Sequence, residues 1–301
     1  MTLVLAISGP WSMWMLTDRR LSAPGKIKSD NACKVMTLDS LANCAILGYA
    51  GLGMTGRGTQ PSDWMSRVLR GRKLTVEQSL IVLGQAAARE FPRHLDRIQD
   101  ERLRNHQIIA TALIDGESRL YSLDAKYSSS RGGYHFQLSR CDETNPPRVR
   151  QIIVAGSGKD SFDPDEAEIN ELLSKIGACE RNKVRPEIVS EHLANINNRV
   201  HHSDETVGPN CIVIWRFKRG GIRNGGGGIE SYNGLKRRGQ AWPPKIVNGF
   251  DTKAIEERLM PIFEEKVAKP MGEGKEIQGM NKDEMNAAIA DLPTGPDERL
   301  R

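Results

Sequence analysis

The sequence predicts an α+β fold in which sheets lie between layers of helices. Segments with the apolar composition of buried strands occur in groups along the first 217 residues. Two pairs of segments with helical spacing of their apolar residues separate these groups. Grouped strands and grouped helices are typical of α+β architectures, whereas α/β folds alternate the two. A four-layer αββα order, with two sheets between two helix layers, satisfies this pattern.

The first strands are expected over residues 3–7, 11–17 and 44–50. Each is mainly apolar, and the Gly9-Pro10 pair between the first two is typical of a turn. These strands would start the two sheets.

Two helices are expected next, over residues 61–69 and 75–90. Pro61 is well placed to begin the first helix, because proline is favoured at the first helical position. Thr75 resembles an N-cap residue for the second, and alanines at 86–88 favour its interior.

The remaining elements of the first 217 residues follow the same grouping. Four further strands are expected, over residues 107–114, 119–123, 134–139 and 149–155. The Asp115-Gly116 pair between the first two of these is a strong hairpin signal. Helices over 164–176 and 185–199 and a last strand over 211–217 complete the pattern.

The composition changes after about residue 218, which divides the chain into residues 1–218 and a C-terminal extension, 219–301. The extension begins with a Gly-rich stretch that we expect to be flexible, so the extension is expected to be partly disordered. Basic residues dominate 216–245, and acidic residues dominate the remainder. Only 251–267 has helical spacing there, and Pro261 is expected to kink or split that helix.

Composition also limits the cellular compartment and the class of protein that the chain can belong to. The net charge is +5, which is too small for a dedicated nucleic-acid coat. The chain has no apolar run long enough for a membrane span, and its N-terminus lacks the basic region of a signal peptide. The five cysteines form no C-x-x-C pair, so we expect reduced thiols in a cytoplasmic protein.

Several familiar sites are not predicted. The six histidines lack metal-ligand spacing, although His201 and His202 with Asp204 form a weak candidate. The chain has no G-x-S-x-G nucleophile elbow, and the glycines at 225–228 are not followed by the G-K-[ST] of a phosphate-binding loop. We therefore expect no metal and no cofactor.

Thr2 is the candidate nucleophile. An initiator Met is normally removed before a small residue, which would make Thr2 the mature N-terminus without cleavage of a longer leader. The hydroxyl of an N-terminal Thr can attack a carbonyl, while its own α-amine accepts the proton near neutral pH. This signal is weak by itself, because many proteins begin Met-Thr.

The spacing of residues downstream of Thr2 strengthens this interpretation. Asp18, Arg20, Lys34 and Gly48 follow it at intervals of 16, 18, 32 and 46 positions. This pattern resembles the β-type subunits of the proteasome, which are N-terminal-nucleophile (Ntn) hydrolases.

Local motifs carry the same resemblance. The segment 17–22 is similar to the A-D-x-R-x-T strand end of that family, and 47–51 is similar to its G-x-A-G turn. The segment 156–158 is similar to its G-S-G turn. Asp204 and Gly208 are similar to its D-x-x-S-G element, except that Val207 stands at the Ser position. The resemblance covers about residues 2–217 and implies an Ntn-type αββα sandwich.

The resemblance implies a role for each residue. Lys34 would lower the pKa of the Thr2 hydroxyl and of its amine, and Asp18 would hold the charge and position of Lys34. Gly48 would offer an oxyanion N–H. Ser157 and Asp204 would bond around the Thr2 amine, and Arg20 would clamp the site from outside. Each residue also has a purely structural alternative. Lys34 could be a surface lysine, Asp18 could form a turn, and Gly48 could mark a strand bulge. Arg20 could be a surface charge, and Ser157 and Asp204 could be ordinary turn and loop residues.

The same resemblance implies a substrate pocket and partners. The first specificity pocket would be lined by apolar residues: Leu21, Ala32, Met36, Ile46, Ala50 and Met54. We therefore expect cleavage of peptides or unfolded proteins after apolar residues. The family assembles stacked rings, so a homo-oligomeric ring, served by an unfoldase partner, is expected.

Two other functions remain open at this stage. The chain could be a non-catalytic assembly or binding protein that kept the fold, which Val207 and the long extension favour. It could also bind nucleic acid through the basic stretch 216–245, because Phe217 and Tyr232 lie among its Lys and Arg residues.

Overall fold

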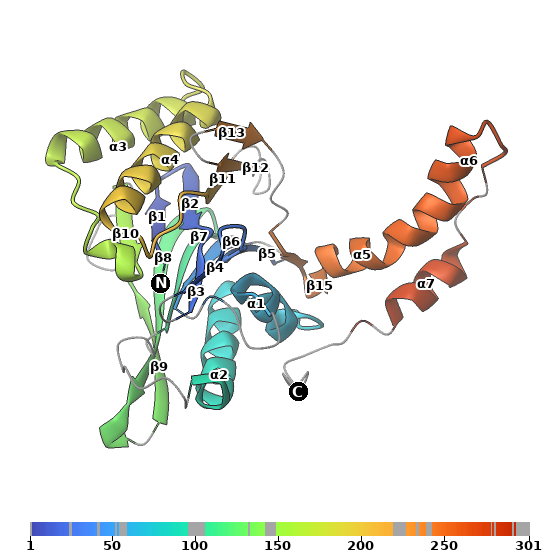
Figure 1. Cartoon of the computed structure of the whole chain (residues 1–301), viewed down its shortest axis with the longest axis horizontal. Helices are drawn as coiled ribbons and strands as arrows, with labels where there is room; N and C mark the ends of the chain where they lie inside the picture. Colours follow the sequence, from blue (N-terminus) through green and yellow to red (C-terminus); the bar gives the residue numbers. More distant parts are fainter. Residues whose placement is uncertain are drawn as a thin grey trace.

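The fold is seen in a computed structural model of the whole chain (Figure 1). The structure describes residues 2–23, 26–40, 43–51, 53, 59–95, 106–131, 133–141, 149–218, 227–232, 235–238, 243–277, 279, 281–290 and 292.

One sheet of the described chain begins with the N-terminal hairpin and is antiparallel throughout. The strand order is β10 (Gln151–Ala155), β1 (Val4–Ser8), β2 (Ser12–Asp18), β11 (Cys211–Phe217), β12 (Gly227–Tyr232) and β13 (Leu235–Arg238). Every residue of the inner strands β1 and β2 is buried, which explains their nearly continuous apolar sequence.

The second sheet carries the strands that follow along the chain. Its order is β15 (Phe250–Asp251), β14 (Lys245–Val247), β5 (Val35–Asp39), β6 (Cys44–Ala50), β7 (His106–Ile114), β8 (Glu117–Ser128) and β9 (Gly133–Arg140). All neighbours are antiparallel except β14 and β5, which run parallel. A separate pair, β3 (Leu21–Ala23) and β4 (Lys26–Ser29), lies beside these sheets.

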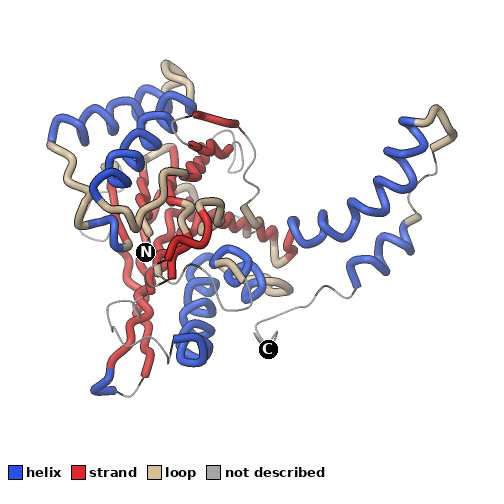
Figure 2. The backbone as a smooth tube through the Cα atoms, in the orientation of Figure 1, coloured by secondary structure: helices blue, strands red, loops and turns tan. Residues whose placement is uncertain are grey.

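Helices cover the outer faces of both sheets (Figures 1 and 2). One core cluster joins α1 (Pro61–Leu69) and α2 (Val76–Leu95) to the second sheet. Another joins α3 (Glu166–Glu180) and α4 (Pro186–Ser203) to the first sheet. A third cluster lies between the two sheets and contains side chains from β1, β2, β5, β6, β7 and β11. The mixed α+β class expected from the sequence is confirmed.

Local sequence signals explain several element boundaries. Pro61 occupies the first turn of α1. Thr75 and Gln78 form a reciprocal capping box at α2, in which each side chain accepts the other residue's backbone N–H. Asp115 and Gly116 both have positive φ, 51° and 81°, as a two-residue hairpin between β7 and β8 requires.

Strands from the extension beyond residue 218 also contribute to the core. Ile246 of β14 is fully buried with the α1 and α2 cluster. Asp251 is 3% exposed and pairs with Arg70 at the end of α1, with Nη2 to Oδ2 at 2.9 Å. Residues 243–251 therefore complete the second sheet.

A helical arm follows and projects from the body of the molecule (Figure 1). It consists of α5 (Thr252–Phe263), a π-helical turn (Glu264–Ala268), α6 (Lys269–Gly272) and α7 (Lys282–Ala290). The helix expected over 251–267 is present as α5 and the π-helical turn, and α7, which was not expected, packs against α5. Pro261 lies inside α5, which continues to Phe263 and passes into the π-helical turn. None of the described helices is long and apolar enough to cross a membrane.

Candidate active site around Thr2

Thr2 lies two residues before β1, against the turn that follows β10. Its carbonyl accepts the N–H of Gly158 at 3.2 Å, and its backbone nitrogen donates to Ser157 Oγ at 3.2 Å. Gly156 in the same turn has φ of 89°, and a Cβ there would lie 2.0 Å from the Thr2 carbonyl oxygen. The G-S-G segment therefore holds Thr2 closely and requires glycine at 156.

Lys34 reaches Thr2 from the residue before β5. Its Nζ donates to Thr2 Oγ1 at 2.8 Å and to Asp18 Oδ1 at 2.9 Å. Lys34 and Asp18 are fully buried, and Thr2 is 1% exposed. Burial lowers the pKa of Lys34, and the Asp18 carboxylate opposes part of that shift. The arrangement places a cation directly on the Thr2 hydroxyl.

Asp18, at the end of β2, accepts four hydrogen bonds. Besides Lys34, Oδ1 accepts the backbone N–H of Leu3 at 2.9 Å. Oδ2 accepts the backbone N–H groups of Arg20 at 2.9 Å and Gly208 at 3.1 Å. Three backbone donors and one ammonium group fix the carboxylate, so it holds Lys34 in position and connects β2 to the loop that contains Gly208.

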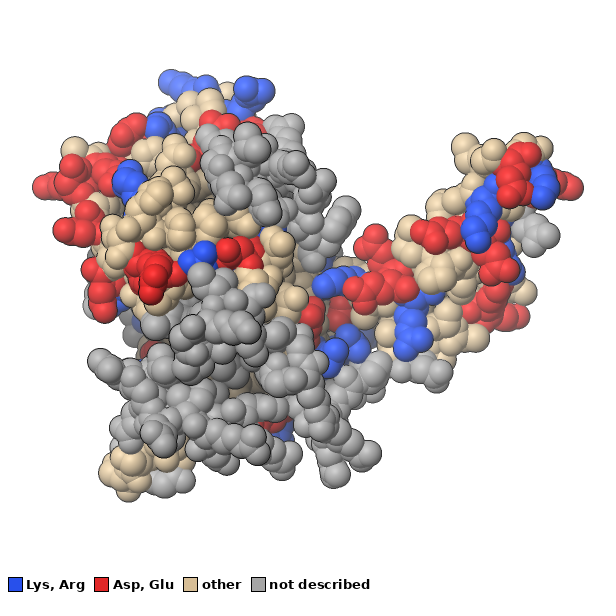
Figure 3. Space-filling view, in the orientation of Figure 1, with Lys and Arg blue, Asp and Glu red and all other residues tan. Residues whose placement is uncertain are grey.

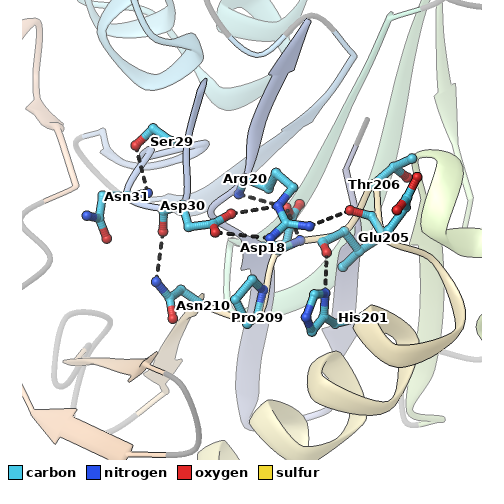
Figure 4. Close-up of polar contacts among 12 residues, drawn as sticks. Asp18, Arg20, Ser29, Asp30, Asn31, His201, Glu205, Thr206, Pro209 and Asn210 are labelled. Atoms are coloured by element: carbon cyan, nitrogen blue, oxygen red, sulfur yellow. Dashed lines mark hydrogen bonds and ion pairs between the residues drawn. The ribbon is translucent and has the colours of Figure 1, made fainter. Parts of the chain in front are cut away.

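Arg20 connects two loops near Asp18 (Figure 4). Its guanidinium binds Asp30 with both oxygens, at 2.6 and 3.0 Å, and also donates to the Glu205 carbonyl. The Asp30 hydrogen bond raises the pKa of Arg20. The Arg20 side chain thus contacts a backbone carbonyl of the loop 204–208 rather than Thr2.

Thr206 is a site residue that the sequence interpretation did not include. Its Oγ1 lies 3.3 Å from Ser157 Oγ and donates to Asp204 Oδ1 at 2.5 Å. Asp204 therefore reaches the Thr2 nitrogen through two hydroxyl groups, whereas the sequence interpretation placed it beside that nitrogen. The signal available in the sequence was a hydroxyl-bearing residue next to Val207.

Gly48 lies in the interior of β6, paired with Val35 on one side and Ile109 on the other. A Cβ at this position would lie 2.8 Å from both Met15 Sδ and Val4 Cγ1. Close packing between the two sheets is therefore sufficient to require glycine. The role of its N–H as an oxyanion donor remains a prediction.

The residues expected to line the first specificity pocket do not all lie together in the structure. Met36 packs in the cluster beneath α1 and α2, whereas Ile46 and Ala50 pack between the sheets. The first two side chains therefore lie on opposite faces of the second sheet. Leu21 lies against Gly53, and Ala32 is fully buried. Met54 lies outside the described residues.

Three basic residues of the stretch 216–245 are used within the fold. Arg216 is buried and pairs with Asp39 at 2.6 Å, and Lys245 pairs with the same carboxylate at 3.0 Å. Lys218 donates to the Gly116 carbonyl at 2.6 Å. On the face shown in Figure 3, acidic side chains gather over α3, and both signs are mixed along the arm. Among the described residues, no cluster of three or more His, Cys, Asp or Glu could hold a metal ion.

Comparison with known proteins adds one distant similarity. No family model matches the chain, and no curated protein matches it. Among solved structures, the chain is similar to Anbu (ancestral beta-subunit) from Yersinia bercovieri. That similarity has 14% sequence identity and a TM-score of 0.45, and it covers 71% of this chain and 81% of that one. The function must therefore be argued from the residues of this chain.

Proposed function

We propose that the chain is a threonine-type peptidase or amidohydrolase in which Thr2 is the nucleophile after Met1 is removed. The observation that carries this proposal is the contact of Lys34 Nζ with both Thr2 Oγ1 and Asp18 Oδ1, at 2.8 and 2.9 Å. Burial of a lysine is costly, and here its ammonium group is directed at a hydroxyl. An ion pair between Lys34 and Asp18 with a purely structural role would not need the Thr2 hydroxyl as a further contact.

The reaction proceeds by acyl transfer. Thr2 Oγ1 attacks the carbonyl carbon of an amide, and the hydroxyl proton passes to the free amine of Thr2. The ammonium of Lys34 favours the ionised form of Oγ1. The C–N bond then breaks as the Thr2 amine returns its proton to the leaving nitrogen. Water hydrolyses the resulting ester and restores Thr2.

The layer order supports an αββα sandwich of the Ntn type for this chain. The three core clusters follow one another as helices, sheet, sheet and helices, and Thr2 lies two residues before β1, an inner strand of one sheet. A peptide or unfolded-protein substrate, a homo-oligomeric ring, an unfoldase partner and a cytoplasmic location belong to the same proposal.

The deciding experiment is the intact mass of the protein before and after exposure to a peptide epoxyketone. This reagent requires both the hydroxyl and the free amine of an N-terminal Thr. We expect loss of Met1 and one adduct, absent in Thr2→Ala and strongly reduced in Lys34→Ala. Lys126→Ala, which changes an exposed lysine, is the matched control and should react like the parent. A processed chain that forms no adduct would refute the proposal.

A non-catalytic binding or assembly protein is the second candidate. The observation that favours it is the burial of Thr2, which is 1% exposed. Adduct formation tests access as well as chemistry, because an epoxyketone must reach both Thr2 Oγ1 and the amine.

A further inference from the structure

We propose that Thr206 is a positioning residue that holds Ser157 against the Thr2 amine, replacing the hydroxyl that Val207 cannot provide. The inference rests on the proposed function of Thr2 as nucleophile. It assigns a role to a residue that the sequence motif does not mark.

Val207 is committed to packing. It is fully buried in the cluster formed with α3 and α4. A Cβ added to Gly158 would lie 2.7 Å from Val207 Cγ2, which shows how closely this side chain packs beside the G-S-G turn. Its neighbour Thr206 is only partly buried, and its hydroxyl contacts Ser157 and Asp204.

The hydrogen bonds among these residues have one consistent direction. Thr206 has a single hydroxyl proton, which it donates to Asp204 Oδ1 at 2.5 Å. The bond of 3.3 Å between Ser157 Oγ and Thr206 Oγ1 must therefore be donated by Ser157. Ser157 Oγ is left to accept from the Thr2 nitrogen at 3.2 Å. Two hydroxyl groups thus connect the Thr2 nitrogen to a carboxylate.

The backbone around Thr206 is held on both sides. Arg20 binds the carbonyl of Glu205, and His201 Nδ1 donates to the carbonyl of Val207 at 2.8 Å (Figure 4). The Thr206 N–H donates to Asp204 Oδ1 at 2.8 Å. The side chain of Thr206 is therefore presented to Ser157 by a loop whose neighbouring peptide groups are already bonded.

This chain of donors acts on the charge of the amine. A carboxylate at its end favours a proton on the Thr2 nitrogen, and the fixed Ser157 oxygen orients that nitrogen beside Oγ1. Lys34 contacts Thr2 at Oγ1 rather than at the nitrogen, and Asp18 binds Lys34. Loss of the Thr206 hydroxyl should therefore change the amine and leave the Lys34 contact in place.

The test compares Thr206→Val, Thr206→Ser and the control Ser203→Ala, which removes an exposed hydroxyl from the end of α4. Each full-length protein is prepared as a fusion whose removal leaves Thr2 at the N-terminus. We expect Thr206→Val to react with the epoxyketone about ten- to a hundredfold more slowly than the parent. Thr206→Ser and Ser203→Ala should react within about threefold of the parent.

A second readout separates this inference from the proposed function. The Thr2 amine is titrated by NMR in protein with labelled threonine, with the peptide epoxyketone absent. We expect a lower amine pKa in Thr206→Val and an unchanged one in Thr206→Ser. If Thr206→Val titrates like the parent, the inference is overturned even where adducts form. If the parent forms no adduct, the proposed function fails, and the titration still decides the role of Thr206.

Discussion

Lys34 Nζ lies 2.8 Å from Thr2 Oγ1, and the two residues are among the most buried polar groups of the chain. They come from different sheets: Thr2 precedes β1 and Lys34 precedes β5. Their contact therefore depends on the packing of one sheet on the other.

Replacement of Lys34 should lower both the rate of adduct formation and the free energy of unfolding. We expect Lys34→Ala to slow epoxyketone adduct formation by about a hundredfold or more, because the Thr2 hydroxyl loses its cation. The free energy of unfolding should fall by about 3 kcal/mol, because Asp18 keeps its three backbone donors but loses its counter-charge. Urea unfolding measures the second quantity and defines conditions in which the variant stays folded. A folded variant that reacts at the parent rate would contradict the proposed role of Lys34.

Asp18→Asn tests the other half of the buried pair. The new side chain keeps the shape of Asp18, but its amide NH₂ would face N–H donors and Lys34 would lose its negative partner. We expect a loss of about 3–5 kcal/mol in unfolding free energy. Asp160→Asn, at an exposed carboxylate, is the matched control and should change stability by less than about 0.5 kcal/mol. Equal stabilities for the two variants would argue against a structural pair at Asp18.

Gly156 is expected to tolerate no side chain. In Gly156→Ala the new methyl group would collide with the Thr2 carbonyl oxygen, and the positive φ adds backbone strain. We expect a loss of more than about 2 kcal/mol together with slower adduct formation, since Thr2 must move. Gly133→Ala, where a Cβ meets nothing within 4 Å, should leave both quantities unchanged. Chemical unfolding and intact mass measure the two effects.

His106 should make the protein less stable in mild acid. Burial lowers its pKa to about 3, and its Nδ1 lies 2.5 Å from the Tyr49 hydroxyl. Between pH 6.5 and about 3 the unfolded chain binds a proton at this residue and the folded chain does not. Stability therefore falls as the pH is lowered through this window, by up to about 1.4 kcal/mol per pH unit.

The measurement is urea unfolding as a function of pH in the parent and in His106→Gln. The variant cannot titrate at this position, so its stability should fall less steeply between pH 6.5 and 3. Identical slopes would show that His106 does not remain neutral in the folded chain. The comparison of slopes removes the contribution of carboxylates, which both proteins share.

Truncation tests the contribution of the C-terminal segment to the core. A chain that ends after residue 218 loses Ile246 and the Arg70–Asp251 pair, whereas a chain that ends after residue 251 keeps them. We expect the shorter chain to have a Tm lower by about 5 °C or more than the longer one. Thermal unfolding followed by circular dichroism measures this difference. Equal Tm values for the two chains would show that residues 243–251 do not stabilise the core.

The sequence was most informative where one strong local signal decided the structure. Cys44–Ala50 and Pro61–Leu69 were expected with their observed bounds, because an uninterrupted apolar run and a leading proline mark them. Val35–Asp39 was not expected as a strand, since Thr37 and Asp39 interrupt its apolar residues. Its partner β14 comes from the far end of the chain, so no local signal could have identified the pairing.

The part of the candidate site that the sequence predicted is the part marked by the spacing of residues after Thr2. The intervals after Thr2 led to Asp18 and Lys34, and the structure brings these three residues together. The hydroxyl of Thr206 beside Val207 was visible in the sequence, but its contact with Ser157 was not, because the direction of a loop side chain depends on how its neighbours pack. The separation of Met36 from Ile46 follows from the register of β5 with β6, which was unknown while β5 itself was not expected.

The parallel pairing of β14 with β5 has a consequence for biosynthesis. Lys34 directly precedes β5, and one edge of β5 is covered by β14, which the ribosome makes long after β5. While the chain is being synthesised, β5 has to remain an uncovered edge strand, and such edges pair readily with other chains. A product that stalls or terminates before residue 245 would therefore contain Thr2, Asp18 and Lys34 and still expose an edge that pairs with other chains. Synthesis of residues 245–247 is thus the step that allows this edge to be covered.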